Sequence, residues 1–247
     1  EPYRALYDLG LHGPDLLFYY KALQSNHVSQ LGGAMHEQPG AVFFERARGV
    51  IRKSKNKDAA LVYALGFICH FALDSTCHPY VEQYVRSSGV SHCEIETEFD
   101  NQLMREDDNM LLRRDGHDPM HYLTASHIQP SRIWANVVAP FYEGISVDEA
   151  YQAMTGMVFV HKMLLASNPA KRWVVLSAMR LAGKWEFMHG LVANPKPNPD
   201  CAESGCGLDA LYQKAIPLAV RLITEYVDGL STDAPLDAAY QHTFGEN

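Results

Sequence analysis

The stretch LVYALGFICHFALDSTCHPY, residues 61–80, is apolar on almost every helical face, yet it carries polar side chains at one-turn intervals. His70, Asp74 and His78 are four residues apart, so in an α-helix they lie about 40° from one another and form a single stripe. A helix this apolar is typical of a protein core. Burying a carboxylate there is costly unless the carboxylate is paired or bound to a metal ion. We therefore expect a core helix whose polar stripe has partners inside the protein.

Helical periodicity extends through most of the chain. Apolar residues recur at helical spacing, and alternating runs rich in Val, Ile and Thr are scarce. We predict an all-α fold, with one multi-helix domain over residues 1–247. Loops are predicted at 116–119 and 193–207. The predicted helices cover residues 14–23, 40–53, 57–83, 92–108, 131–143, 147–166, 170–190 and 208–229.

Composition and charge restrict the protein class. Hydrophobic residues make up 47% and charged residues 20% of the 247 residues, which is typical of a globular protein. The apolar run LVYALGFICHFAL is interrupted by His70 and soon followed by Asp74, so we expect a soluble protein without a transmembrane segment. The net charge of -8 argues against electrostatic binding of nucleic acid or anionic membranes, although bound divalent cations would cancel part of it locally.

The cysteines and the amino terminus leave the cellular compartment open. The five cysteines are odd in number and contain no CxxC pair, so they predict neither a disulfide framework nor a thiolate zinc site. The sequence begins at Glu1-Pro2 without an initiator methionine, and no signal peptide is visible in it. This pattern slightly favours the cytoplasm over secretion.

The polar stripe has two interpretations. One is an internal hydrogen-bond pair between His70 and Asp74, since buried polar groups are usually satisfied within the protein. The other is a zinc ion, because imidazole nitrogen and carboxylate oxygen are normal zinc ligands and side chains four residues apart can reach one ion. The segment HCEIE repeats this spacing with His92 and Glu96, which would otherwise belong to a solvated helix face.

Two further candidate ligands precede the stripe. Asp15 in LHGPD and His36 in AMHEQPG each stand at a turn beside apolar residues. Asp15 could simply cap a helix after Pro14, and His36 could be an ordinary loop histidine. The residues alone do not choose between these interpretations.

The order of these residues resembles the zinc-dependent phospholipase C family, which is related to the fungal single-strand-specific nucleases. The resemblance covers roughly the first hundred residues and implies a zinc site within residues 12–96, with a helical remainder over 97–247. It implies two zinc ions, with Asp74 bridging to a third. His12 is a weak candidate ligand for this third ion, because we expect it to be a turn or cap histidine. The implied ligands of the first zinc are Asp15, His36, His70 and Asp74. Those of the second are His78, His92 and Glu96.

The resemblance implies a zinc-dependent phosphodiester hydrolase, of phospholipase C type, in which Asp15 is both a ligand and the general base. The substrate would be a phospholipid or another phosphodiester, and peripheral contact with a membrane surface would follow. Choline-selective members carry aromatic residues at two places where Leu16 and Gly33 stand here, so choline preference is not implied. A single-strand nuclease or nucleotidase is the first alternative, although the acidic balance disfavours nucleic acid. A non-catalytic binding protein stabilised by zinc is the second.

Two other groups of residues are assigned no catalytic role. The segment GHDPMHYLTASH contains His117, His121 and His127, which we interpret as surface or capping histidines rather than a second metal site. The aromatic residues Trp173, Trp185 and Phe187 are expected in the core. Whether Cys201 and Cys206 form a disulfide is left open.

Overall fold

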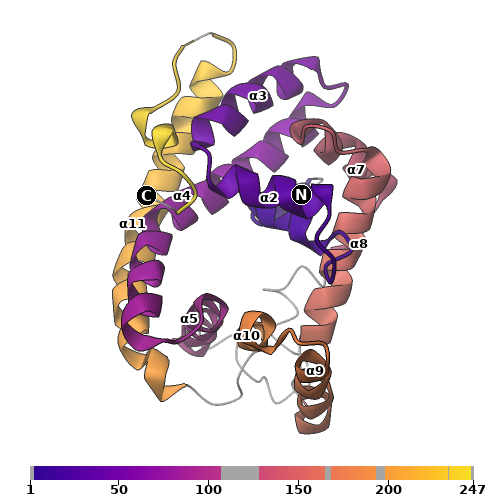
Figure 1. Ribbon diagram of the computed structural model, residues 1–247. Helices are drawn as coiled ribbons and strands as arrows, with labels where there is room; N and C mark the ends of the chain where they lie inside the picture. Colours follow the sequence, from indigo (N-terminus) through magenta and orange to yellow (C-terminus); the bar gives the residue numbers. More distant parts are fainter. Residues whose placement is uncertain (1–2, 107–127, 165–167, 193–197, 233, 246–247) are drawn as a thin grey trace. The chain divides into compact units, whose positions relative to one another are not determined.

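The computed structural model describes residues 3–106, 128–164, 168–192, 198–232 and 234–245, and these residues contain α- and 3₁₀-helices with no β-strand (Figure 1). The predicted all-α class is confirmed. Residues 3–106 form α1 (Arg4–Gly10), η1 (Gly13–Tyr19), α2 (His27–His36), α3 (Gly40–Lys53), α4 (Lys57–Ser88) and α5 (His92–Glu106). The remaining described residues form α7 (Arg132–Val138), η3 (Ala139–Phe141), α8 (Val147–Leu164), α9 (Pro169–Leu181), α10 (Trp185–Met188), η4 (His189–Leu191), η5 (Pro199–Cys201), α11 (Ala202–Gly229) and η6 (Ala238–Gln241).

Contacts along the chain define two compact units. Unit 1 contains the residues up to His78, the segment Ile128–Val158 and the residues from Tyr212 onward. Unit 2 contains Pro79–His127 and Phe159–Leu211, as far as those ranges are described. Helices α4, α8 and α11 contribute residues to both units. The expectation of one domain over residues 1–247 stays a prediction, and each unit is described by itself.

Aromatic side chains fill the core of unit 1. Phe43 of α3 stacks on Phe67 of α4, with ring centroids 3.8 Å apart, and Phe71 of α4 stacks on Tyr240 of η6 at 5.5 Å. Phe44 is fully buried and packs edge-on against Phe67 and Phe71. Rings of this size dominate core energetics through the apolar area they bury. Their packing ties α3 and the carboxyl-terminal segment to the helix that carries the polar stripe.

Two glycines let α1 and α4 cross in backbone contact. A Cβ atom at Gly10 would lie 2.2 Å from the carbonyl oxygen of Tyr63 and 3.0 Å from the Cα atom of Gly66. Any side chain at this crossing would therefore push the helices apart. The chain leaves α1 directly after Gly10, so residues 11–13 pass beside the next turn of α4, where His70 lies.

The core of unit 2 gathers on one face of α9. Val175 and Met179 are 8% and 6% exposed, and they form a cluster with Leu164 of α8 and Val192. Partly buried residues of α8, α9, α10 and η4 pack around this cluster. Burial of this face fixes the rotation of α9 about its own axis.

The prediction that Trp173 belongs to the core is wrong. Its exposure is 71%. The reason is helical phase, because residues two apart point about 160° away from each other, and Val175 occupies the buried face. Trp185 is half-buried.

Several predicted boundaries differ from the structure. The helix predicted over 14–23 is the shorter 3₁₀-helix η1, and neither α1 nor α2 is among the predicted helices. The helix predicted over 170–190 is divided into α9 and α10 because Gly183 adopts a φ of 65°, which ends a helix. The loop predicted over 193–207 contains the start of α11 at Ala202.

Part of the sequence prediction falls outside the described residues. The loop predicted at 116–119 lies there, as do His117, His121 and His127. The side chains of Phe187 and Cys206 are likewise not described. Their predicted roles stay predictions.

Helix α4 is long and apolar enough to cross a membrane by length and composition alone. However, 61% of its most apolar window is buried inside the protein. Such burial is expected of a core helix packed against other helices, and it supports the expectation that α4 does not span a bilayer.

Candidate metal centre

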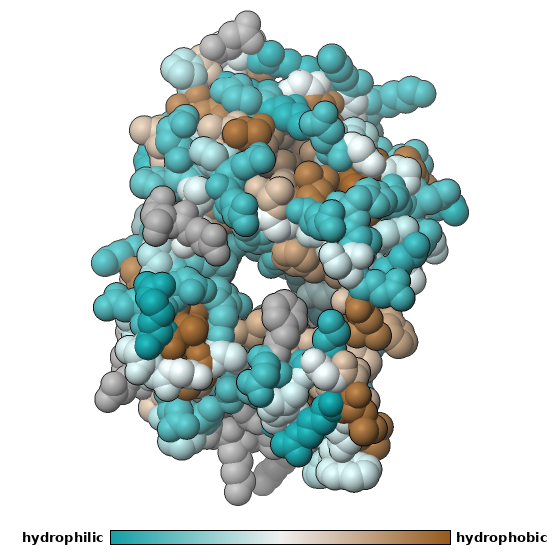
Figure 2. Space-filling model, viewed as in Figure 1, coloured by the Kyte–Doolittle hydropathy of each residue, from teal (hydrophilic) through white to brown (hydrophobic). Residues whose placement is uncertain are grey.

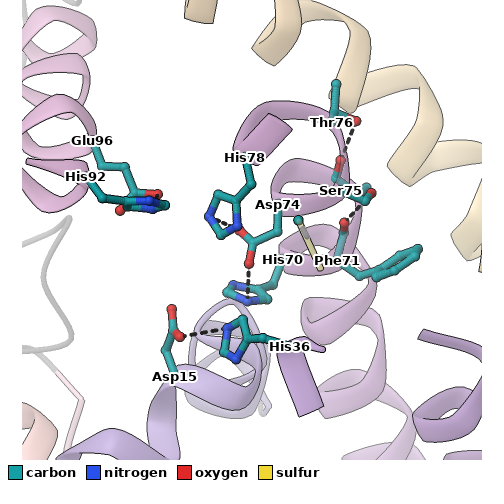
Figure 3. A network of polar contacts seen from close by, with 12 residues as sticks. Asp15, His36, His70, Phe71, Asp74, Ser75, Thr76, His78, His92 and Glu96 are labelled. Atoms are coloured by element: carbon teal, nitrogen blue, oxygen red, sulfur yellow. Dashed lines mark hydrogen bonds and ion pairs between the residues drawn. The ribbon is translucent and has the colours of Figure 1, made fainter. Parts of the chain in front are cut away.

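Unit 1 brings together the four residues predicted to bind one zinc. Asp15 lies in the first turn of η1, His36 is the last residue of α2, and His70 and Asp74 stand one turn apart on α4. Figure 3 shows their side chains directed toward one another. One ligand atom from each of Asp15, His36 and His70 lies within 4.8 Å of the others. Helix geometry places His70 beside Asp74, whereas the turn after α1 places Asp15 beside His36, the last residue of α2.

Each contact in this group joins an imidazole Nε2 atom to a carboxylate oxygen. His36 Nε2 lies 3.1 Å from Asp15 Oδ1, and His70 Nε2 lies 2.9 Å from Asp74 Oδ2. The other oxygen of Asp74, Oδ1, is 3.8 Å from His78 Nε2, one turn further along α4. Asp74 thus stands between two histidines of the stripe, as a bridging carboxylate would.

The backbone sets the orientation of both central imidazoles. His36 Nδ1 lies 2.8 Å from the carbonyl oxygen of Gly32, and His70 Nδ1 lies 3.2 Å from that of Leu11. In each case the Nδ1–H group donates to the carbonyl oxygen, which leaves Nε2 as the lone-pair nitrogen in the neutral ring. Metal-binding histidines are commonly held in this way.

Two buried atoms of the group support a metal ligand set. His70 and Asp74 are 8% and 7% exposed. Although His70 Nε2 and Asp74 Oδ2 approach within 2.9 Å, neither forms an aligned hydrogen bond. Buried polar atoms normally have hydrogen-bond partners, and these two atom types are ordinary zinc ligands. The donor set therefore fits a zinc ion.

Gly13 allows the chain to approach the edge of the His70 ring. Its φ is 50°, in the left-handed region, and a Cβ atom here would lie 2.1 Å from Cδ2 and 2.6 Å from Nε2 of His70. The hydroxyl of Tyr142 donates to the Gly13 carbonyl oxygen at 2.9 Å, and the hydroxyls of Tyr142 and Tyr63 are 2.6 Å apart. These buried groups fix the turn that delivers Asp15. The two tyrosines are not among the predicted site residues, and the only local signal for this turn is the glycine in HGPD.

The carboxyl-terminal segment forms a wall of the same group. Phe244 is 1% exposed, and its ring centroid lies 5.7 Å from that of His36 and 6.0 Å from that of His70. Its backbone N–H donates to the carbonyl oxygen of His36 at 3.3 Å. At Gly245 a Cβ atom would lie 2.3 Å from Nδ1 of His78. No motif in the sequence indicates this contact.

In unit 2, His92 lies between two carboxylates. His92 Nε2 is 3.0 Å from Glu96 Oε1, as the one-turn spacing predicts, and His92 Nδ1 is 2.8 Å from Glu82 Oε1. Glu82 is not among the predicted site residues, yet it continues the four-residue series of the stripe beyond His78. Because His78 belongs to unit 1 while His92 and Glu96 belong to unit 2, the second zinc ligand set stays a prediction.

Comparison with known proteins identifies the family. A model of the family described as zinc dependent phospholipase C matches residues 2–145, more than half of the chain. The chain belongs to the zinc-dependent phospholipase C family. Among curated proteins and solved structures, no match was found. The family match contains all the predicted ligands, whereas Phe244 and Gly245 lie beyond it.

Neighbouring carboxylates raise the pKa values of His70 and His92 in this phospholipase C family member. Burial acts to lower the pKa of His70, but the Asp74 carboxylate outweighs it, and the pKa is raised to about 9. Burial also acts to lower the pKa of His92, but Glu96 and then Glu82 raise it to about 9. In the absence of metal, these raised pKa values favour the protonated form of both imidazoles at pH 7.

Zinc binding is therefore expected to release protons at neutral pH. Zinc requires neutral imidazole, so an ion binding His70 at pH 7 must displace its proton. The affinity for zinc should weaken about tenfold per pH unit for each displaced proton as the pH falls below about 9.

Titration calorimetry in buffers of different ionisation enthalpy would count the protons released on zinc binding. His27→Asn, which changes a mostly exposed histidine paired with Glu149, should leave the count unchanged, whereas zinc binding without proton release would contradict the assignment.

Proposed function

We propose that the protein is a zinc-dependent phosphodiester hydrolase that cleaves phospholipid head groups as a phospholipase C. The observation that carries the proposal is the convergence of Asp15, His36 and His70 beside Asp74, with the His70 and Asp74 side chains buried and 2.9 Å apart. Membership of the zinc-dependent phospholipase C family supplies the reaction class.

Two zinc ions are proposed, each bound by its own ligand set. Asp15, His36, His70 and Asp74 would hold the first. His78, His92 and Glu96 would hold the second. By the family resemblance, Asp74 would also bridge to a third ion if one binds. Since structural zinc is usually enclosed by four ligands, two ions sharing seven ligands leave a coordination position for substrate or water and favour catalysis over a structural role.

Asp15 is the proposed general base. When bound, paired zinc ions would polarise the phosphoryl oxygens and bring the pKa of water toward neutrality. Asp15 would orient the attacking water and take its proton. Its side chain is 43% exposed, whereas those of His70 and Asp74 are 8% and 10% exposed, so Asp15 is the carboxylate of this set that water reaches most easily. The backbone of Gly13, held by Tyr142, keeps it in place.

The assay that tests the proposal compares lipid and nucleic acid substrates. Purified protein would be incubated with short-chain phosphatidylcholine, phosphatidylethanolamine and phosphatidylserine, and in parallel with single-stranded DNA and RNA. We expect diacylglycerol release that a chelator abolishes and zinc restores. Release of nucleotides alone would establish the nuclease alternative. If no phosphodiester is hydrolysed, the remaining interpretation is a non-catalytic binding protein stabilised by zinc.

A further inference from the structure

Helix α9 of unit 2 presents an apolar strip to solvent. Trp173, Val174 and Leu181 are 71%, 56% and 90% exposed. By helical phase they lie within about 100° of one another, so they share one face. Figure 2 shows hydrophobic residues on the surface over this helix. A strip containing an exposed tryptophan and an almost fully exposed leucine is unusual for a surface that contacts only water.

Basic residues border the strip. Lys171 and Arg180 are exposed and lie by helical phase on its two opposite edges, and the exposed Lys184 follows the end of the helix. From 168 to 186 the sequence contains four basic residues and one acidic residue, Glu186, although the whole chain has a net charge of -8. The local charge is therefore opposite to that of the protein. The expectation from net charge, that anionic membranes are avoided, does not hold for this helix taken by itself.

The strip cannot turn inward, because the opposite face of α9 is anchored. Val175 and Met179 are buried in the core of unit 2. Arg172 donates a hydrogen bond to the carbonyl oxygen of Val192 at 3.1 Å, which adds a polar contact on the buried side of the helix. The exposed face is thus a fixed feature of the folded unit.

We propose that α9 is a docking surface for an anionic phospholipid bilayer. The helix would lie in the plane of the interface, with Trp173, Val174 and Leu181 inserted among the acyl chains near the head groups. Lys171, Arg180 and Lys184 would contact the anionic head groups. Charge complementarity selects this partner, since an apolar strip with basic edges matches a surface with an apolar interior and an anionic boundary. The docking proposal does not depend on the proposed function. The further idea that the same bilayer supplies the substrate does rest on the proposed function.

Vesicle sedimentation tests the docking surface. The full chain carrying Asp15→Asn, which prevents consumption of the lipid, would be mixed with vesicles of phosphatidylcholine alone or with about 30% phosphatidylserine. We expect stronger binding to the anionic vesicles. Trp173→Ser with Leu181→Ser should lower the partition coefficient at least about tenfold. Lys171→Gln with Lys184→Gln should remove the preference for anionic vesicles.

A matched control uses an exposed hydrophobic residue of unit 1. Ile133 of α7 is also 71% exposed, but its neighbour Arg132 is paired with Asp148. Ile133→Ser should leave vesicle binding unchanged. The proposal is overturned if the Asp15→Asn chain does not bind anionic vesicles, or if the α9 variants made in it bind as well as Ile133→Ser. It is also overturned if sedimentation velocity shows a dimer that Trp173→Ser dissociates, because α9 would then contact a second copy.

Hydrolysis of a water-soluble short-chain phospholipid separates this proposal from the proposed function. With Asp15 restored, the α9 double variants should hydrolyse that substrate at the wild-type rate, since they lie outside the ligand set. Vesicle binding without hydrolysis by the wild type would contradict the proposed function alone. Hydrolysis without vesicle binding would contradict the docking surface alone.

Discussion

Asp15→Asn is expected to lower kcat for phosphodiester hydrolysis by about 10²- to 10⁴-fold, the range that a general base supplies. Asparagine has nearly the shape of aspartate, but its amide cannot take a proton from water and is a poor zinc ligand. The loss of stability should be small, because the Asp15 side chain is 43% exposed and an ion pair at such a position contributes little. Activity should therefore fall far more than the free energy of unfolding.

The measurement is steady-state kinetics on a short-chain phospholipid, with zinc content determined on the same samples. Asp58→Asn is the matched control, since Asp58 is an exposed aspartate in the first turn of α4 and has no role in the site. It should retain wild-type kcat. If Asp15→Asn keeps both its zinc and its activity, the base is another residue.

Gly13→Ala should have the second large effect, on both stability and zinc binding. The new methyl group would strain the backbone and would also clash with the ring of His70, a predicted zinc ligand. A Cβ atom at this position would lie 2.1 Å from the ring of His70, and a φ of 50° disfavours any residue with a side chain. We expect a loss of about 2–4 kcal/mol in the free energy of unfolding, from left-handed strain plus overpacking. Displacing the His70 ring should also weaken zinc binding by about 10- to 100-fold.

Two glycine variants separate these contributions. Gly144→Ala has a comparable φ of 74° with no neighbouring atom within 4 Å, so it should cost only the strain, about 1 kcal/mol. Gly33→Ala in α2 meets no atom within 4 Å and should be neutral or stabilising. Denaturant unfolding and zinc titration would be compared across the three. If Gly13→Ala behaves like Gly144→Ala in both measurements, the packing of Gly13 against His70 is not important for the site.

The sequence predicts those parts of the fold and site that depend on local periodicity. The four-residue spacing of His70 and Asp74 correctly places them side by side on one buried helix, because α-helix geometry alone determines that relation. The same series extends to Glu82, which the prediction omits although the spacing indicates it. The core helices α3 and α4 are predicted well because their apolar faces are long and continuous.

Other features depend on contacts between distant segments and have no local signal. Helix α2, HVSQLGGAMH, contains two glycines that weaken helix propensity, and its existence rests on the Asn26 capping box and on packing. His36 is therefore at the end of a helix and not in a turn between loops. The wall formed by Phe244 is set by the packing of η6 on α3 and α4. Trp173 is expected in the core because it is aromatic, but it lies on the face of α9 opposite the buried Val175 and is therefore exposed.

Metal content tests the central claim most directly. Protein purified without added metal would be passed through gel filtration and subjected to elemental analysis, with protein concentration determined independently. The ligand sets in α4 and around Asp15, His36, His92 and Glu96 predict two zinc equivalents per chain, or three if Asp74 bridges to a further ion. Protein that contains no zinc, and that takes up none when zinc is supplied, would contradict the account.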